Sequence, residues 1–184
     1  RSEMCIRDRA DTYWDIGRKF GTIGMMKRGY QVEITTYRAD SYDPQSRKPT
    51  VAFGDNLDDD LVRRDFTIGA MAVRLPSRTF VDPYNGLSAL ESRTITTPGS
   101  ATTSFTDDPL RMMRAARFVS QLGFSLAPEV RAAMSDMADR IAIVSAERVR
   151  DELTKLIVGA EPWAGIDALV NTCLLYTSLM ARGR

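Results

Sequence analysis

The residues of this chain that could do chemistry are carboxylates and arginines, and their densest grouping lies at one predicted helix start. Two aspartates and a proline at 107–109 precede a helical pattern in which arginine recurs every third residue, at Arg111, Arg114 and Arg117. Aspartate before proline favours a helix N-terminus, because the carboxylate complements the helix dipole. Arginine at the same end opposes that dipole. The basic stripe is therefore either a solvated face or a site for a phosphate or a base.

An aspartate beside an arginine at this helix start can read the edge of a nucleotide base. Adenine and cytosine each offer an exocyclic N–H donor beside a ring-nitrogen acceptor, which an Asp acceptor and an Arg donor match. Guanine and uracil place a carbonyl oxygen where the carboxylate lies, so acceptor meets acceptor. Asp108 and Arg111 are the candidates for this reading. Arg114 and Arg117 would bind phosphate or ribose, and Asp107 would set the entry.

A second cluster lies just upstream, where Arg63 and Arg64 precede Asp65. On a segment that passes from helix to strand, these side chains would bind ribose and phosphate. The alternative is a cluster of surface ion pairs. The three aspartates at 58–60 are interpreted as charge before a helix, in a loop, and not as a metal site.

Composition excludes several kinds of site among the 184 residues. Histidine is absent, which removes histidine metal ligands, catalytic triads and histidine general bases. The two cysteines, Cys5 and Cys173, lie near opposite ends and predict neither a zinc site nor a disulfide framework, so a reducing, cytoplasmic compartment is expected. The net charge is +1, so any nucleic-acid binding depends on local arginine clusters. No apolar run approaches the roughly 18 residues of a membrane span.

The elements that position these residues divide into a mixed α/β part and a helical part. In the first part we expect a polar loop at 40–56, a helical start at 60–70, and strands at 20–25, 30–37, 71–75 and 80–81. A turn is expected at 26–29. In the second part we expect helices at 109–122, 128–140 and 146–158, and another from Pro162. The predicted domains are residues 10–95 and 107–172, with a Thr/Ser/Gly/Pro-rich linker at 96–106.

The two ends of the chain have a different character. Residues 1–9 and 173–184 resemble translated sequencing-adapter sequence of the kind found at the ends of environmental reading frames. Both are predicted to be non-native, and the chain is expected to be cut at both ends.

Four segments in order resemble the class II CCA-adding tRNA nucleotidyltransferases and their poly(A) polymerase relatives. They are residues 63–70, 82–86, 107–118 and 146–153. The resemblance covers residues 10–170 and implies an α+β fold. In that fold an incomplete polymerase-β-like nucleotidyltransferase head, with mixed and antiparallel strands, precedes an all-helical neck. The chain departs from the family's usual Asn, Glu, Gly and Asp at Gly69, Asp107, Asn85 and Ala89 respectively.

The resemblance also implies roles for individual residues. It assigns nucleotide binding to Arg64, Asp108, Arg111, Arg114 and Arg117, with Arg63, Asp65 and Asp107 as neighbours. Glu147 and Arg148 would support the base-reading helix from the neck. Glu33 matches a position that could supply a third metal carboxylate; the alternative is a plain surface glutamate.

The family adds C, C and A to tRNA 3′ ends from CTP and ATP, with Mg²⁺ held by an Asp-x-Asp pair after a Gly-rich turn. Neither feature stands upstream of Trp14, so the chain is predicted to be an inactive fragment with no main metal ligands. The expected partners are the tRNA 3′ end, CTP and ATP. No membrane association is expected, and the sequence does not predict the oligomeric state. Two alternatives remain: a poly(A) polymerase that takes ATP alone, and a non-catalytic RNA-binding helical module.

Overall fold

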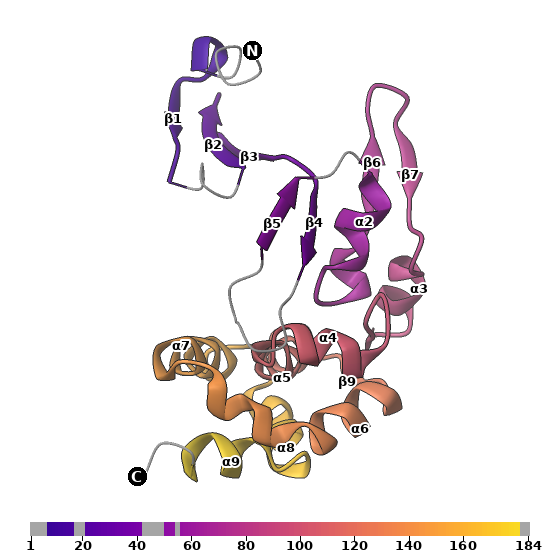
Figure 1. Cartoon of the computed structure of the whole chain (residues 1–184), viewed down its shortest axis with the longest axis vertical. Helices are drawn as coiled ribbons and strands as arrows, with labels where there is room; N and C mark the ends of the chain where they lie inside the picture. Colours follow the sequence, from indigo (N-terminus) through magenta and orange to yellow (C-terminus); the bar gives the residue numbers. More distant parts are fainter. Residues whose placement is uncertain (1–6, 17–20, 42–49, 54–55, 181–184) are drawn as a thin grey trace. The chain divides into compact units, whose positions relative to one another are not determined.

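The computed structural model describes residues 7–16, 21–41, 50–53 and 56–180 (Figure 1). It confirms the mixed α+β composition that the sequence predicts. The chain divides into two compact units, residues 1–60 and 61–184. The predicted linker at 96–106 thus lies inside the second unit.

In the first unit three antiparallel strands form one sheet, in the order β1 (Thr12–Trp14), β2 (Thr22–Lys27) and β3 (Tyr30–Thr35). The turn between β2 and β3 is shorter than predicted. It consists of Arg28 and Gly29, whose φ values of 50° and 79° suit a two-residue hairpin. The carboxylate of Asp11 accepts hydrogen bonds from the Arg28 N–H (2.7 Å) and from Lys27 Nζ (3.2 Å). These two hydrogen bonds lower the pKa of Asp11.

The first unit differs from the sequence expectations in two places. Every residue of β3 is exposed, so this strand has no buried face. The predicted loop at 40–56 was wrong at its described ends, because β4 (Arg38–Ser41) pairs antiparallel with β5 (Thr50–Phe53). The remainder of that loop, at 42–49 and 54–55, lies outside the described residues.

The aspartates at 58–60 lie in the first turn of α2 (Leu57–Val62), as expected for charge at a helix start, and not in a loop. The side-chain oxygen of Asn56 accepts the N–H of Asp58 at 3.0 Å and caps this helix. The segment after α2 forms a short 3₁₀ helix and a hairpin, η2 (Thr67–Gly69), β6 (Ala72–Arg74) and β7 (Thr79–Val81). Both strands of the hairpin lie where the sequence predicts them.

The turn after β7 is built around a capped helix start. The Asp82 carboxylate accepts the N–H groups of Gly86 (2.6 Å) and Leu87 (2.9 Å) at the start of α3 (Gly86–Glu91). Asn85, just before the helix, has a φ of 58°. Asparagine tolerates this left-handed conformation better than most residues, so the turn is kept.

The segment predicted as a linker contains a helix, α4 (Ala101–Asp107). The Ser100 hydroxyl accepts the Thr103 N–H at 3.1 Å and caps this helix. A serine that indicated a linker is therefore the N-cap of α4. The next helix, α5 (Leu110–Leu122), ends as predicted at Gly123, whose φ is 64°. The strand β8 (Thr94–Ile95) precedes α4 in the sequence, and β9 (Ser125–Leu126) follows α5. These two strands pair with each other in parallel. The sequence predicted no strand after residue 107.

The rest of the second unit is helical. Its elements are α6 (Pro128–Asp136), the 3₁₀ helix η3 (Ala138–Ile143), α7 (Ala146–Ile157), α8 (Pro162–Asn171) and α9 (Leu174–Met180). The predicted second helix ends at Asp136, and η3 continues past its expected end. Leu174 of α9 is fully buried. The non-native origin of the segment at 173–184 stays a prediction.

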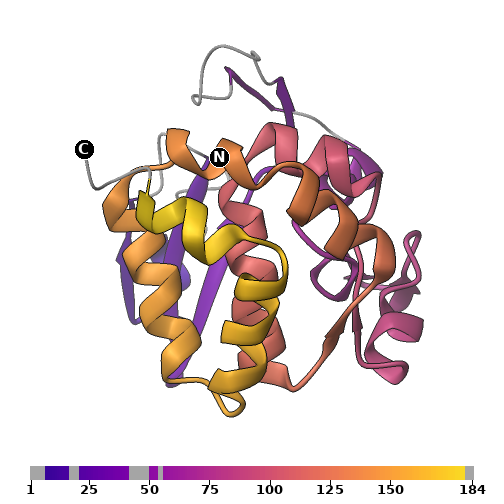
Figure 2. The same ribbon diagram turned by 90° about the horizontal axis from the view of Figure 1, so that it is seen from below.

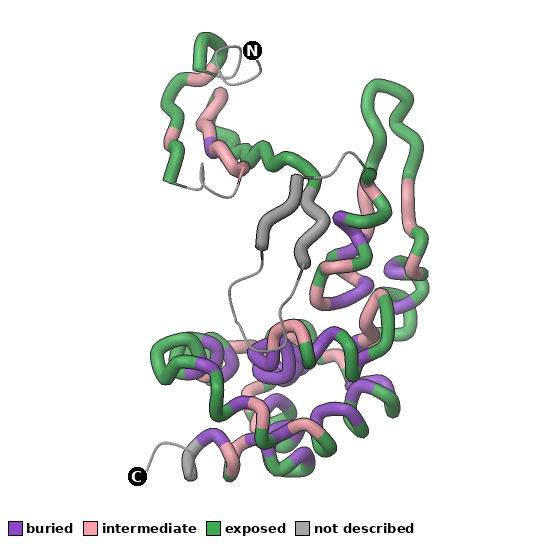
Figure 3. Tube along the Cα trace, viewed as in Figure 1, coloured by how far each residue is buried: buried purple, intermediate pink, exposed green. Residues whose placement is uncertain are grey.

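The core of the second unit centres on α5, which lies alongside α7 and α8 (Figure 2). Much of α5 is buried (Figure 3). Met112, Met113 and Ala115 are among its buried residues. Gly165 lets α8 approach α5 closely, because a Cβ at that position would lie 2.8 Å from the Cβ of Ser120. Within the described residues, no helix has the length and apolar character needed to cross a membrane.

Candidate nucleotide-binding site

Asp108 lies between α4 and α5, and its carboxylate has two partners. Oδ1 accepts the Leu110 N–H at 3.1 Å, at the first residue of α5, whose N-cap position is Pro109. Oδ2 accepts a hydrogen bond from Arg148 Nη2 on α7 at 3.0 Å. The Asp108 and Arg148 side chains are 27% and 48% exposed, so this ion pair is open to solvent. A contact from α7 therefore holds the carboxylate at the helix start.

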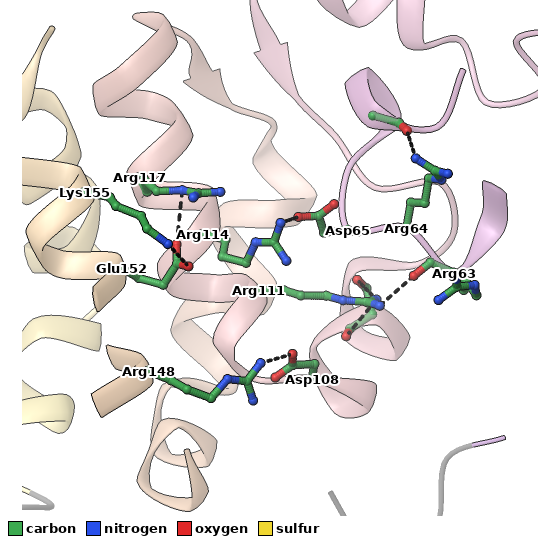
Figure 4. Close-up of polar contacts among 12 residues, drawn as sticks. Arg63, Arg64, Asp65, Asp108, Arg111, Arg114, Arg117, Arg148, Glu152 and Lys155 are labelled. Atoms are coloured by element: carbon green, nitrogen blue, oxygen red, sulfur yellow. Dashed lines mark hydrogen bonds and ion pairs between the residues drawn. The ribbon is translucent and has the colours of Figure 1, made fainter. Parts of the chain in front are cut away.

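Arg111 is buried, and its guanidinium is surrounded by oxygen atoms (Figure 4). Nη1 donates to the Ser104 hydroxyl at 2.8 Å and to the Ser104 carbonyl at 3.4 Å. Nη2 donates to the Arg63 carbonyl at 2.6 Å. The sequence analysis predicts that Asp108 and Arg111 together read a base. The structure places them one turn apart, each held by a different set of partners.

Asp107 ends α4 and is half-buried. Burial raises the pKa of its carboxyl group, and the positive charge of Arg111 partly offsets that rise. The carboxylate form of Asp107 is therefore disfavoured relative to that of an exposed aspartate.

The upstream arginine cluster reaches α5 through an ion pair. Asp65 Oδ2 lies 2.7 Å from Arg114 Nη2, with side chains 18% and 36% exposed. Arg64 donates from Nη1 to the Gly69 carbonyl at 3.1 Å, within its own segment (Figure 4). Arg63 contributes its backbone carbonyl to Arg111. The two clusters found in the sequence are thus in direct contact.

Arg117 lies deeper, in a buried ion pair with α7. Its Nε lies 3.1 Å from Glu152 Oε2, with side chains 12% and 9% exposed. Lys155 approaches the other oxygen of Glu152 at 3.6 Å, and the Arg117 guanidinium lies 4.4 Å from the centre of the Phe118 ring. Burial lowers the pKa of Arg117, and the charge of Glu152 opposes that change. The interpretation of the arginine stripe as a solvated face is wrong, since Arg111 and Arg117 are largely enclosed.

Two residues of this site were missed by sequence reasoning, Ser104 and Glu152. Glu152 lies three residues after Val149 and four before Leu156, so it shares their apolar stripe on α7. A charged residue on a buried stripe was the available signal. Ser104 precedes the buried Phe105 in a segment whose helix was itself not predicted.

Glu33, the candidate metal carboxylate, is exposed on β3 in the first unit and pairs in register with Gly24. Across the described part of the chain, no three His, Cys, Asp or Glu side chains gather so that they could hold a metal ion. These residues therefore do not fit a Mg²⁺ site.

Comparison with known proteins gives two family matches along the chain. Residues 1–96 match the poly A polymerase head domain, and residues 123–179 match a probable RNA and SrmB-binding site of polymerase A. The CCA-adding enzyme of Geobacillus thermodenitrificans is 42% identical over 161 residues, covering 87% of this chain and 40% of that protein. The CCA-adding enzyme of Lactobacillus johnsonii is 44% identical over 143 residues, covering 77% of this chain and 36% of that protein.

Solved structures give the same result. The crystal structure of the Bacillus stearothermophilus CCA-adding enzyme in complex with CTP has a TM-score of 0.80 and 38% identity, covering 90% of this chain and 40% of that one. A CCA-adding enzyme in apo form II has a TM-score of 0.81 and 27% identity, covering 96% and 42%. The chain thus spans about 40% of the length of the relatives it matches. Because the head-domain match covers residues 1–96, more than half of the chain, the chain belongs to the poly(A) polymerase head-domain family, and it is similar to the CCA-adding enzymes.

Proposed function

We propose that this chain is the nucleotide-selecting part of a template-independent tRNA nucleotidyltransferase, which adds C, C and A to tRNA 3′ ends from CTP and ATP. The similarity to CCA-adding enzymes over 87% of the chain supports this proposal. The similar Bacillus stearothermophilus structure was determined with CTP. The complete activity and its tRNA partner are proposed for a protein of the relatives' full length. A cytoplasmic location stays a prediction from the sequence.

The observation that carries the proposal is the presence of Asp108 and Arg111 three residues apart at the start of α5, each with hydrogen-bonding capacity left over. A carboxylate accepts about four hydrogen bonds, and two contacts are occupied, by Leu110 and Arg148. A guanidinium has about five N–H donors. Among the described residues, Arg111 makes two contacts from Nη1, to Ser104, and one from Nη2, to Arg63, so about two donors remain. Acceptor capacity therefore remains on Asp108 and donor capacity on Arg111, the two kinds of group that the edge of adenine or cytosine needs.

The triphosphate would lie against the more open arginines. Arg114 is 36% exposed and shares its charge with a single carboxylate, Asp65. Arg63 and Arg64 would add positive charge from the upstream segment. Arg117 would reach a ligand only by opening its buried pair with Glu152.

Transfer itself needs Mg²⁺ held by close carboxylates. Because the described residues do not fit that ion, we propose that the 184-residue chain alone incorporates no nucleotide into tRNA. Incorporation of labelled CTP by the purified chain would refute this part of the proposal.

Nucleotide selection is testable by equilibrium binding of CTP, ATP, UTP and GTP to the purified chain. We expect CTP and ATP to bind about tenfold more tightly than UTP and GTP, within the range that one well-placed bidentate contact gives. Asp108→Ala and Arg111→Ala should each remove the preference. Asp151→Ala is the control, since its side chain is 60% exposed on α7 and pairs with Arg150.

The same titration separates the alternatives. Preference for ATP alone would indicate a poly(A) polymerase. RNA or nucleotide binding that survives both site substitutions unchanged would indicate a non-catalytic RNA-binding module, for which the family match at residues 123–179 is the favouring observation.

A further inference from the structure

Ser104 contacts both halves of the proposed base reader. Its carbonyl accepts the backbone N–H of Asp108 at 3.2 Å. Its hydroxyl accepts a hydrogen bond from Arg111 Nη1 at 2.8 Å. Ser104 and Arg111 are 7% and 8% exposed, so water competes little for the second contact. Ser104 therefore links the backbone of Asp108, the proposed acceptor, to the side chain of Arg111, the proposed donor.

The hydroxyl is the only side-chain acceptor among the recorded contacts of the Arg111 guanidinium with the described residues. The other two are backbone carbonyls, of Arg63 at 2.6 Å and of Ser104 itself at 3.4 Å. The hydrogen bond to the Ser104 carbonyl is long, at 3.4 Å, and this carbonyl already accepts the Asp108 N–H. Without the hydroxyl, Nη1 keeps only this weak contact, while Nη2 stays bound.

A guanidinium is a planar fork whose donors point in fixed directions. Two strong contacts, one on each terminal nitrogen, fix the rotation of that plane. One strong contact leaves the plane free to turn about the remaining hydrogen bond. The direction of the donors left for a base, relative to the Asp108 carboxylate, then depends on the Ser104 hydroxyl.

We propose that Ser104 is a positioning residue that sets the base preference of this site by fixing the Arg111 guanidinium. The inference rests on the proposed function, since it assumes that Asp108 and Arg111 read a base. It assigns a specificity role to a residue that acts through Arg111. Binding of the triphosphate, which depends on Arg114 and its neighbours, should change much less than base preference.

The test compares base preference in three variants of the full chain. Ser104→Ala should reduce the preference for CTP over UTP, and for ATP over GTP, by about tenfold, the scale of one bidentate base contact. Ser104→Thr keeps a hydroxyl and should retain the preference. Ser120→Ala is the matched control, because Ser120 is also fully buried and its hydroxyl donates to the Leu156 carbonyl at 2.6 Å, away from Arg111.

The ratios of dissociation constants separate positioning from general loss of stability. Loss of preference in Ser104→Ala, with both other variants selective, supports the inference. A selective Ser104→Ala chain overturns it while the proposed function stands. Equal loss in Ser120→Ala also overturns it, because preference would then follow core stability. A wild-type chain without preference overturns the proposed function, and the inference falls with it.

Discussion

Replacing Glu152 with alanine should destabilise the second unit by about 3 kcal/mol, because the change leaves a buried positive charge without its partner. Arg117 Nε and Glu152 Oε2 lie 3.1 Å apart, with side chains 12% and 9% exposed. Breaking a buried pair of this kind costs about 3–5 kcal/mol. We expect the lower end, since Arg117 keeps its contact with the Phe118 ring at 4.4 Å. That contact is worth roughly 0.5–2 kcal/mol.

Urea unfolding followed by far-UV circular dichroism measures this loss, and the neighbouring residue provides the control. Asp151→Ala removes an acid from the same helix, but its pair with Arg150 is 60% and 73% exposed. It should therefore cost less than about 0.5 kcal/mol. The double variant Arg117→Met, Glu152→Leu should recover most of the lost stability, because no unpaired charge remains. The reasoning is refuted if Glu152→Ala loses no more than Asp151→Ala, or if the double variant is as unstable as the single one.

Two further predictions concern a titrating carboxyl group and a close helix contact. Burial raises the pKa of Asp107, so this group favours folding at low pH and that contribution is lost as the pH rises through the folded-state pKa. Asp107→Asn should therefore raise the free energy of unfolding at neutral pH and give no gain below the ordinary carboxyl pKa of 3.8; a loss at neutral pH in urea unfolding would contradict this. Gly165→Ala should destabilise by about 2 kcal/mol, because the new Cβ would lie 2.8 Å from the Ser120 Cβ and 2.9 Å from the Ala116 carbonyl oxygen. Gly69→Ala, with no atom within 4 Å, is its control, and equal melting curves for the two variants would argue against the close approach.

Strong local signals predicted the elements that carry the site. Proline before α5 and Gly123 after it mark a helix whose apolar stripe is clear, and the structure has that helix. The arginines of this helix and the cluster at 63–65 were predicted as site residues. In the structure Arg114 pairs with Asp65, and Arg111 donates to the Arg63 carbonyl. What they bind stays a prediction.

The missed features depend on contacts distant in the sequence. The hydroxyl of Ser104 becomes part of the site only because α4 packs so that Arg111, seven residues later, reaches it. Glu152 becomes the partner of Arg117 through packing of α7 against α5. The strands β8 and β9 are two residues each, too short for an alternating pattern, and their pairing joins residues 94–95 to 125–126.

The pairing of β8 with β9 has a consequence for how the protein is made. Backbone hydrogen bonds from Ser125 to Arg93 (2.9 Å) and from Ala127 to Ile95 (3.1 Å) tie the two ends of the segment that holds α4 and α5. During synthesis the chain emerges from its N-terminus, so these bonds form only after Ala127 has left the ribosome. The backbone closure around α4 and α5 is thus completed late. A nascent chain that stops a few residues short of Ala127 would contain every reader residue and lack the backbone tie that closes around them.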